Sequence, residues 1–184
     1  IEGMRDNVES NSVDLIFTDP PYGIDGDKLD AHYNRDESNV VPGYVEVPLE
    51  TYGQFSMDWI TQCARVLRPG GSMYIVSGYT NLHHILNALH STDLTEVNHI
   101  IAEYSFGVST TKKYVSSHYH VLFWSKPPAK KQQRTFNTNA YYADSKDSYH
   151  DRLTVQKMPR SHKPGQIKNK NQLSEDFIEK FIMY

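Results

Sequence analysis

The chain has 184 residues, enough for one domain with a single buried core. Its net charge is −3 and 38% of its residues are hydrophobic, but no apolar run approaches the roughly 18 residues that a membrane span needs. A single cysteine, Cys63, excludes an internal disulfide framework, so we expect a soluble protein of a reducing compartment with no membrane partner.

The first predicted element is a strand. Val13–Thr18 is a short, mostly apolar and β-branched run, which is typical of a buried parallel strand. It leads into Asp19-Pro20-Pro21-Tyr22-Gly23, where two prolines end strand pairing and fix the backbone. Residues 25–48 are acidic and aperiodic, which predicts a long mobile loop beside the strand end.

Helices and strands then alternate. Apolar residues from Phe55 to Leu67 recur at helical spacing, with Cys63 among them as a buried structural thiol, and Pro69-Gly70-Gly71 is expected to end this helix. The next elements are a strand at 72–77, a helix around 82–89, and two strands at 97–106 and 118–126. This alternation predicts a doubly wound α/β sheet, in which ligands bind beyond the carboxyl ends of the strands.

The last third of the sequence is basic. Residues 112–170 carry thirteen Lys or Arg residues against three acidic ones, which indicates either a polyanionic partner or a solvated basic loop. Periodicity is poor from 127 to 166. An apolar stripe from Leu173 to Ile182 then predicts a final helix after a polar start.

The turn after the first strand can support methyl transfer to an exocyclic amine. Such an amine is a poor nucleophile, and acceptors placed against its two N–H bonds favour the nitrogen geometry of the transition state. The Asp19 carboxylate and the Pro20 carbonyl can be those acceptors. Tyr22 offers a stacking face worth about 1–3 kcal/mol to a base that has left the duplex. The structural alternative is a rigid turn.

Asp19-Pro20-Pro21-Tyr22 at the end of a strand closely resembles motif IV of the amino-methyltransferases that act on DNA. The segments at 66–72 and 116–124 resemble the helix–turn–strand joint and a later strand of that family. Lys170-Asn171-Gln172-Leu173 resembles motif X, which touches the cofactor. The resemblance implies S-adenosyl-L-methionine as cofactor, contacted by Asp19 and residues 170–173, and catalytic roles for Asp19, Pro20, Pro21 and Tyr22.

The order of these motifs resembles the permuted, β-type arrangement, in which a glycine-rich cofactor loop follows motif X. No Gly-x-Gly occurs in the sequence, so we interpret it as a fragment of a Rossmann-like S-adenosylmethionine-dependent methyltransferase that lacks this loop. We expect a catalytic core at 1–126, a DNA target-recognition region at 127–166, and the start of the motif X helix at 167–184.

The expected reaction is methylation of a flipped base in double-stranded DNA, at N6 of adenine in preference to N4 of cytosine. A role in restriction–modification, in the prokaryotic cytosol or nucleoid, would fit; a homodimer and a companion restriction subunit are both left open. No metal is expected, because His118 and His120 lack a third ligand. The residues expected to contact DNA are Lys112, Lys113, His118, Lys130, Lys131, Arg134, Arg152, Lys157 and Arg160.

Two rival interpretations stay open. The same turn acts on adenines of ribosomal RNA or on a protein glutamine in enzymes that place the glycine-rich loop before the turn. The other rival is a binding module that has lost catalysis. The basic stretch favours a DNA enzyme over a glutamine one, and the intact Asp19 and Tyr22 favour an enzyme over a decayed module.

Overall fold

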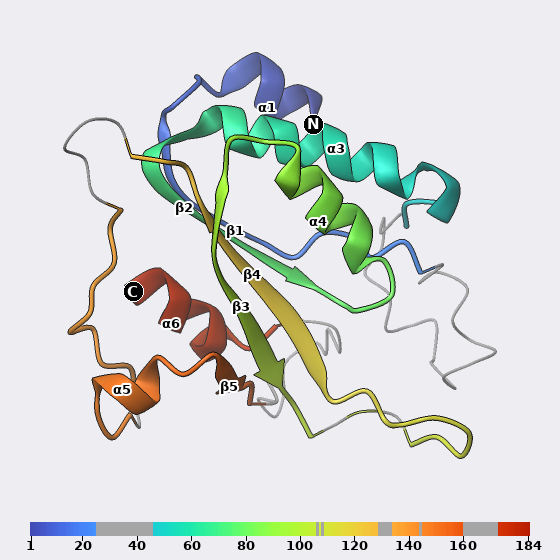
Figure 1. Cartoon of the computed structure of the whole chain (residues 1–184), viewed down its shortest axis with the longest axis vertical. Coiled ribbons are helices and arrows are strands. Elements are labelled where there is room, and N and C mark those ends of the chain that lie inside the picture. The colour runs from blue at the N-terminus through green and yellow to red at the C-terminus, as the bar shows by residue number, and fades with distance from the viewer. Residues whose placement is uncertain (25–45, 106, 108, 129–133, 144, 160–172) are drawn as a thin grey trace, which may run out of the picture.

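A computed structural model describes residues 1–24, 46–105, 107, 109–128, 134–143, 145–159 and 173–184. In this part of the chain the strands form one five-stranded sheet with the order β1-β2-β4-β3-β5 (Figure 1). The strands are β1 (Val13–Thr18), β2 (Leu67–Ser77), β3 (Thr95–Glu103), β4 (His118–Ser125) and β5 (Val155–Lys157). The helices are α1 (Glu2–Asn7), α3 (Leu49–Val66), α4 (Leu82–His90), α5 (Ser148–Asp151) and α6 (Glu175–Met183).

Strand directions bring several chain segments to one edge of the sheet. β1 runs parallel to β2, and β5 runs parallel to β3, whereas β4 is antiparallel to both β2 and β3. The ends of β1, β2, β3 and β5 therefore meet the beginning of β4 at the same edge. The predicted α/β sheet is confirmed, and it is mixed rather than all-parallel because the consecutive strands β3 and β4 pair with each other.

Helices cover both faces of the sheet, as the alternating pattern predicts (Figure 1). On one face, Ile60 of α3 and Ile85 of α4 are fully buried against residues of the sheet such as Leu122. On the other face, Phe177 and Phe181 of α6 pack with a second cluster that contains sheet residues. The helices α3, α4 and α6 thus bury the apolar stripes that predict them.

Cys63 lies on the buried face of α3, in the core cluster, and is 2% exposed. Burial raises the pKa of its thiol to about 11, so the group is neutral at ordinary pH. The expectation of a structural thiol is confirmed.

Two details of the first strands differ from the prediction. β1 is half-buried and, within the described residues, is an edge strand rather than a fully buried one. The second strand was predicted to begin at Ser72, after Pro69-Gly70-Gly71. In the structure, β2 begins at Leu67 and includes these three residues. The residues instead form a bulge: Val13 pairs with Leu67 and Leu15 with Ser72, and Gly70 takes a positive φ of 77°.

The basic region contributes to the sheet. Val155–Lys157 forms β5, and the next residue, Met158, is 6% exposed and packs in the core beside α6. The predicted boundaries at 126 and 166 stay predictions, but this part of the region is joined to the main sheet. α6 confirms the predicted final helix, with its first residue at Glu175.

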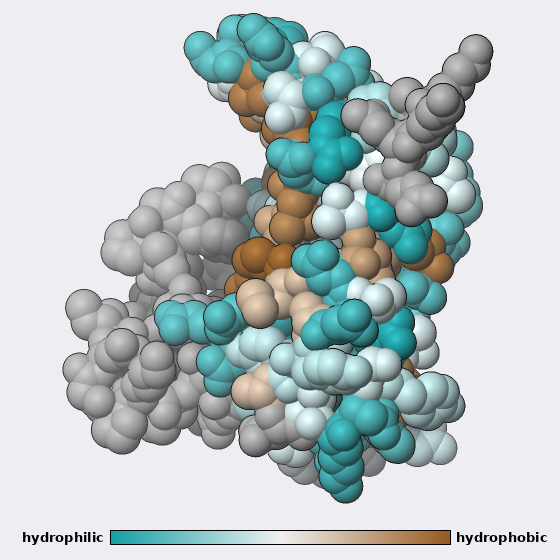
Figure 2. Space-filling view, turned by 90° about the vertical axis from the view of Figure 1, so that its left-hand side faces the viewer, coloured by the Kyte–Doolittle hydropathy of each residue, from teal (hydrophilic) through white to brown (hydrophobic). Residues whose placement is uncertain are grey.

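The surface is unevenly apolar. Figure 2 shows hydrophobic side chains in a band between two hydrophilic surfaces. Ile182 and Met183 at the end of α6 are about half exposed, at 54% and 47%. No helix in the described ranges is long and apolar enough to cross a membrane.

Candidate active site

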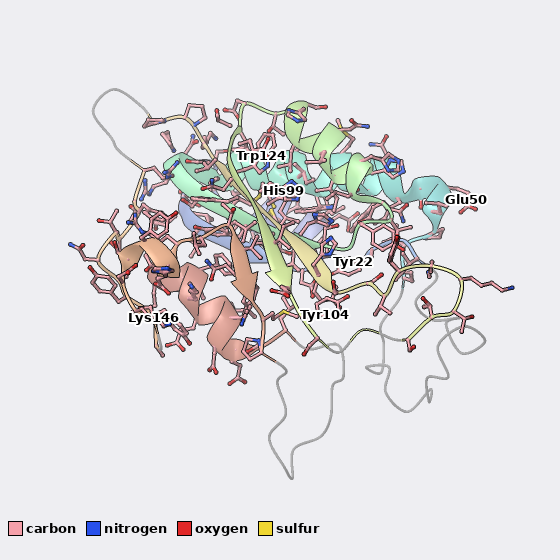
Figure 3. The ribbon with its side chains drawn as sticks, turned by 60° about the horizontal axis from the view of Figure 1, so that its bottom comes forward. Tyr22, Glu50, His99, Tyr104, Trp124 and Lys146 are labelled. Carbon is pink, nitrogen blue, oxygen red and sulfur yellow. The ribbon has the colours of Figure 1, made fainter. Side chains whose placement is uncertain are left out.

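The Asp19–Gly23 turn lies at the sheet edge where the strands end. It follows β1 directly, beside the end of β2. The ring of Tyr22 lies close to Gly78: a Cβ atom added to Gly78 would be 3.4 Å from the Cδ2 atom of Tyr22. Figure 3 shows Tyr22 near Tyr104 at the strand ends, whereas Trp124 lies farther back along the sheet. The turn is thus at the position where α/β sheets bind ligands.

Asp19 has one recorded partner among the described residues, the hydroxyl of Tyr22, which donates to its Oδ1 over 2.6 Å. No ion pair involves this carboxylate in that part of the chain. Asp19 is exposed by surface area, yet desolvation by the protein around it raises its pKa to about 6, although the hydrogen bond from Tyr22 lowers it. Asp19 can therefore be ionised and accept hydrogen bonds at neutral pH.

The turn presents a second acceptor. Pro20 is buried, and no group in the described ranges donates a hydrogen bond to its carbonyl. Burial and the neighbouring Asp19 raise the pKa of Tyr22 well above its ordinary value, so the phenol stays neutral. The turn therefore combines a carboxylate, a buried carbonyl without a donor and a neutral aromatic ring.

Side chains from three other segments hold the rest of the turn. The Tyr52 hydroxyl donates to the Pro21 carbonyl over 2.8 Å, and the Asn81 amide donates to the carbonyls of Tyr22 and Gly23, each over 2.8 Å. Glu46 accepts from the Gly23 N–H over 3.0 Å. Sequence reasoning missed these anchors, because Tyr52 lies in a helix, Asn81 precedes one, and Glu46 lies in the acidic loop region.

Gly23 is required at its position for two reasons. Its φ is +65°, a conformation that side chains disfavour, and an added Cβ would lie 2.7 Å from the Tyr52 ring. The glycine therefore lets the turn approach Tyr52 closely enough for the hydrogen bond to Pro21.

Two more tyrosines extend the aromatic surface of Tyr22. The ring of Tyr119, in β4, lies 6.2 Å from that of Tyr22, and the ring of Tyr104, just after β3, lies 4.9 Å from that of Tyr119. The resemblance included the Tyr119 segment as a later strand of the family, whereas Tyr104 was missed, since no motif includes it. The three rings can contribute stacking surface to a planar ligand.

The histidines on β3 and β4 contact one another. His118 and His120 have rings 5.1 Å apart, and the Nδ1 atom of His120 lies 2.7 Å from the Nε2 atom of His99. Burial, with the neighbouring His99 and His118, lowers the pKa of His120 to about 4. In the described ranges, no group of three or more His, Cys, Asp or Glu residues could hold a metal ion.

The predicted DNA contacts are spread over the molecule. Lys112 and Lys113 are exposed on the connection between β3 and β4, beside the 98% exposed Tyr114. Arg134 lies over the ring of Phe123, 5.2 Å from its centroid. Three more of the predicted residues are found elsewhere: His118 half-buried at the start of β4, Arg152 bonded to Ser148 after α5, and Lys157 exposed in β5.

Other predicted residues are not described by the structure. They are Lys130, Lys131, Arg160, Lys170, Asn171, Gln172 and most of the predicted loop, residues 25–45. Of the motif X segment only Leu173 is described; it is 8% exposed and packs in the core cluster with Phe177.

Comparison with known proteins gives consistent matches. A family model described as DNA methylase, N6_N4_Mtase, matches residues 13–183. The type II methyltransferase M.HpaI of Haemophilus parainfluenzae is 33% identical over 125 residues, covering 67% of this chain and 36% of the relative. M.BglII, a type II methyltransferase of Bacillus subtilis, is 27% identical over 203 residues, covering 96% and 52%. The chain thus spans between a third and about half of the length of these relatives.

Solved structures share the fold. TTHA0409 of Thermus thermophilus aligns with a TM-score of 0.63 at 15% identity, covering 99% of this chain and 70% of that one. The PvuII DNA methyltransferase, which is cytosine-N4-specific, aligns with a TM-score of 0.57 at 13% identity, covering 87% and 55%. A complex of M1.HpyAVI with SAM aligns at 0.52 and 17% identity, covering 98% and 67%. The sheet described above is therefore a Rossmann-like methyltransferase fold.

Proposed function

Because this chain belongs to the DNA methylase family, whose model it matches over residues 13–183, we propose that it carries the catalytic turn of a DNA methyltransferase. The reaction is transfer of a methyl group from S-adenosyl-L-methionine to the exocyclic amine of a flipped base, N6 of adenine; the sulfur leaves as a neutral thioether, and the nitrogen loses one proton to water. One observation carries the proposal: the Asp19 carboxylate and the carbonyl of buried Pro20, to which no described residue donates, are adjacent acceptors beside the ring of Tyr22.

These two acceptors suit the two N–H bonds of an amine. When each N–H donates to an acceptor, the nitrogen lone pair is withdrawn from the ring and directed out of its plane, as the transition state requires. The ring of Tyr22 holds the base flat meanwhile. Asp19 must be ionised for this role; Tyr22 donates to its Oδ1 atom, and the carboxylate has further acceptor sites for the amine.

The cofactor is assigned from the chemistry of the turn and from relatives. S-adenosyl-L-methionine, when bound, supplies a methyl group on a positively charged sulfur. The negative carboxylate of Asp19 can lie close to this positive sulfur. Neither the carboxylate nor the carbonyl of the turn is a nucleophile strong enough to take the methyl group in place of the amine. Leu173 packs against residues of α6, and its proposed role is to hold the cofactor side of the site in place without a polar contact to the cofactor. Lys170, Asn171 and Gln172 are the further candidates.

N4 of cytosine is the second candidate, because the cytosine-N4-specific PvuII methyltransferase has a similar fold. Cytosine carries the same kind of amine, so the two acceptors would serve it in the same way. Adenine is preferred because a tetrapeptide that begins with aspartate is more typical of the N6 enzymes of this family. Both reactions leave Asp19 and Pro20 in the same roles.

Double-stranded DNA is the proposed substrate. Lys112 and Lys113 lie on the connection that joins β3 to β4, and these strands carry or adjoin Tyr104 and Tyr119 of the aromatic surface. In Figure 1 this connection projects away from the sheet at the edge where β3 ends and β4 begins. Lysines there can contact phosphates while the base occupies the turn.

The test uses the full-length protein, unmethylated genomic DNA and S-adenosyl-L-methionine with a labelled methyl group. We expect label in DNA, and digestion to nucleosides followed by mass spectrometry separates N6-methyladenine from N4-methylcytosine. Asp19→Ala should reduce the rate by about 10²- to 10³-fold, as for loss of a transition-state hydrogen-bond partner. Asp58→Ala, which removes an exposed carboxylate of α3, is the matched control and should leave the rate unchanged.

Two results would contradict the proposal. One is full activity of Asp19→Ala. The other is label that enters ribosomal RNA or a protein glutamine in place of DNA, which would support the rival enzymes instead.

A further inference from the structure

Asn81 has an unusual role for its position. It is the N-cap residue of α4, where an asparagine side chain ordinarily accepts a hydrogen bond from the first turn of the helix. Here its side chain makes no such bond. Its amide donates instead to the carbonyls of Tyr22 and Gly23, 59 and 58 positions away in sequence. A helix-capping function therefore does not account for this buried residue, which is 7% exposed.

Tyr52 is directed to the same turn from α3. It is 1% exposed, and its hydroxyl donates to the Pro21 carbonyl. Burial, with Glu46 and Asp19 nearby, raises its pKa to about 12, so the hydroxyl remains a donor. Tyr52 and Asn81 come from the two helices that cover one face of the sheet, and those helices pack in one core cluster.

Together these two side chains take up the carbonyls of three consecutive residues, Pro21, Tyr22 and Gly23. The carbonyl of the residue before them, Pro20, has no donor in the described ranges. Each peptide unit is a rigid plane, so a held carbonyl orients the plane to which it belongs. The ring of Pro21 fixes the φ angle that joins the plane of the Pro20 carbonyl to this held segment, so contacts on the following residues limit the direction of the Pro20 carbonyl.

We propose that Tyr52 and Asn81 are positioning residues for methyl transfer, which hold the turn so that the Pro20 carbonyl and the Asp19 carboxylate face the two N–H bonds of the amine. This inference rests on the proposed function. Neither side chain needs to touch the substrate, because each acts through the backbone of the turn. Small displacements of reacting groups cost much rate, so the two contacts affect turnover more than binding.

The test compares Tyr52→Phe and Asn81→Ser with the wild type in the full-length protein. Tyr52→Phe removes one oxygen and keeps the packed ring. Asn81→Ser keeps a good N-cap residue for α4 but is too short to reach both carbonyls. Tyr74→Phe is the matched control, since Tyr74 is another buried tyrosine, 3% exposed, whose recorded ring contacts are with residues such as Phe123 and Phe181.

Three quantities are measured for each variant: the single-turnover rate of labelled methyl transfer, the dissociation constant for DNA, and the midpoint of thermal unfolding. We expect the rate constant to fall about 10-fold in Tyr52→Phe and about 10- to 100-fold in Asn81→Ser. The DNA dissociation constant should stay within about twofold, and Tyr74→Phe should match the wild type in all three. A purely structural role would instead lower the unfolding midpoint and the rate together.

Wild-type rates in both variants, or equal losses in Tyr52→Phe and Tyr74→Phe, overturn the inference. Should Asn81→Ser fail to fold, Tyr52→Phe alone decides the question. Asp19→Ala, measured beside them, separates the proposed function from the positioning role. If it retains activity, the proposed function fails; if it is inactive while both variants are normal, only the positioning role fails.

Discussion

The pair formed by Asp19 and Tyr22 combines two opposing influences on one carboxylate. Desolvation raises the pKa of Asp19 to about 6, and the hydroxyl of Tyr22, 2.6 Å away, lowers it. The hydroxyl also takes up one acceptor site on the Oδ1 atom of Asp19. Under the proposed function, Tyr22 would therefore affect the charge of Asp19 in addition to offering a ring for stacking.

This pair predicts a pH dependence. Methyl transfer should rise as pH increases through about 6, because Asp19 accepts fully only when ionised. Tyr22→Phe removes the contact that lowers the pKa, so the midpoint should move to higher pH. Single-turnover rates measured across this range test both points, with Tyr149→Phe, an exposed tyrosine, as control. An unchanged midpoint in Tyr22→Phe would show that the hydroxyl does not affect the carboxylate.

The same pKa has an opposite effect on stability. The folded-state value lies above the ordinary 3.8, so the folded chain holds this proton more tightly than the unfolded one. The contribution of Asp19 to the free energy of unfolding is therefore present at low pH and is lost as pH rises through about 6. Near that pH, activity and this part of the stability change in opposite directions.

At the scale of elements, α5 is tied to α6 through one buried carboxylate. Asp151 forms a salt bridge of 2.9 Å with Lys180 of α6, and it accepts from the Tyr142 N–H and from the Tyr184 hydroxyl. Burial raises the pKa of Asp151, but the hydrogen bonds from Tyr184 and Lys180 outweigh it and hold the pKa below its ordinary value. Asp151 thus stabilises the fold at neutral pH, and this stabilisation is lost as pH falls.

Asp151→Ala should lower the free energy of unfolding by about 3 kcal/mol, because it leaves the half-buried Lys180 without its ion-pair partner and with the neutral Gln156 side chain as acceptor. Asp147→Ala is the matched control from the N-cap of the same short helix. Asp147 is exposed and pairs with His150, so its loss should cost much less than the loss of Asp151. Urea unfolding measures both. Equal losses would contradict a special role for the link between α5 and α6.

Sequence patterns predicted the elements that bury one apolar face, such as α3, α4 and α6, because such a face imposes a period on the sequence. They also located the Asp19–Tyr22 turn, since its four residues carry chemistry that an ordinary turn does not need. Patterns did not predict β5, which is three residues long. Nor did they identify Tyr52 and Asn81, because those contacts depend on how helices distant in sequence pack beside the turn.

At the scale of the molecule, the basic residues that the structure describes lie in separate groups, and one of these groups is close to the candidate site. The exposed Lys112 and Lys113 lie on the connection next to the aromatic surface, whereas Arg152 follows α5 on the opposite side of the view in Figure 1. A duplex that presents a base to Asp19 would contact Lys112 and Lys113, because these lysines lie nearest the turn. Phosphate contacts of this kind make affinity depend on salt.

DNA affinity of the full-length protein should therefore fall steeply with salt, by on the order of 10³-fold between about 50 and 200 mM if six or more phosphates are contacted. Lys113→Glu should weaken binding and reduce the steepness of this dependence by about one unit of slope or more. Arg5→Glu on α1, at the other end of the molecule in Figure 1, is the charge-matched control. Filter binding over a series of salt concentrations measures both slopes. A salt-independent affinity would refute electrostatic contact.

The hydrogen bond between Tyr22 and Asp19 has a consequence for the end of the catalytic cycle. A methylated amine keeps a single N–H, so it can no longer satisfy both Asp19 and Pro20. The phenol of Tyr22 already donates to Asp19, so the carboxylate keeps a donor when the single N–H of the product turns to Pro20. Under the proposed function, the loss of one N–H therefore weakens the contact between the turn and the methylated base and favours its release.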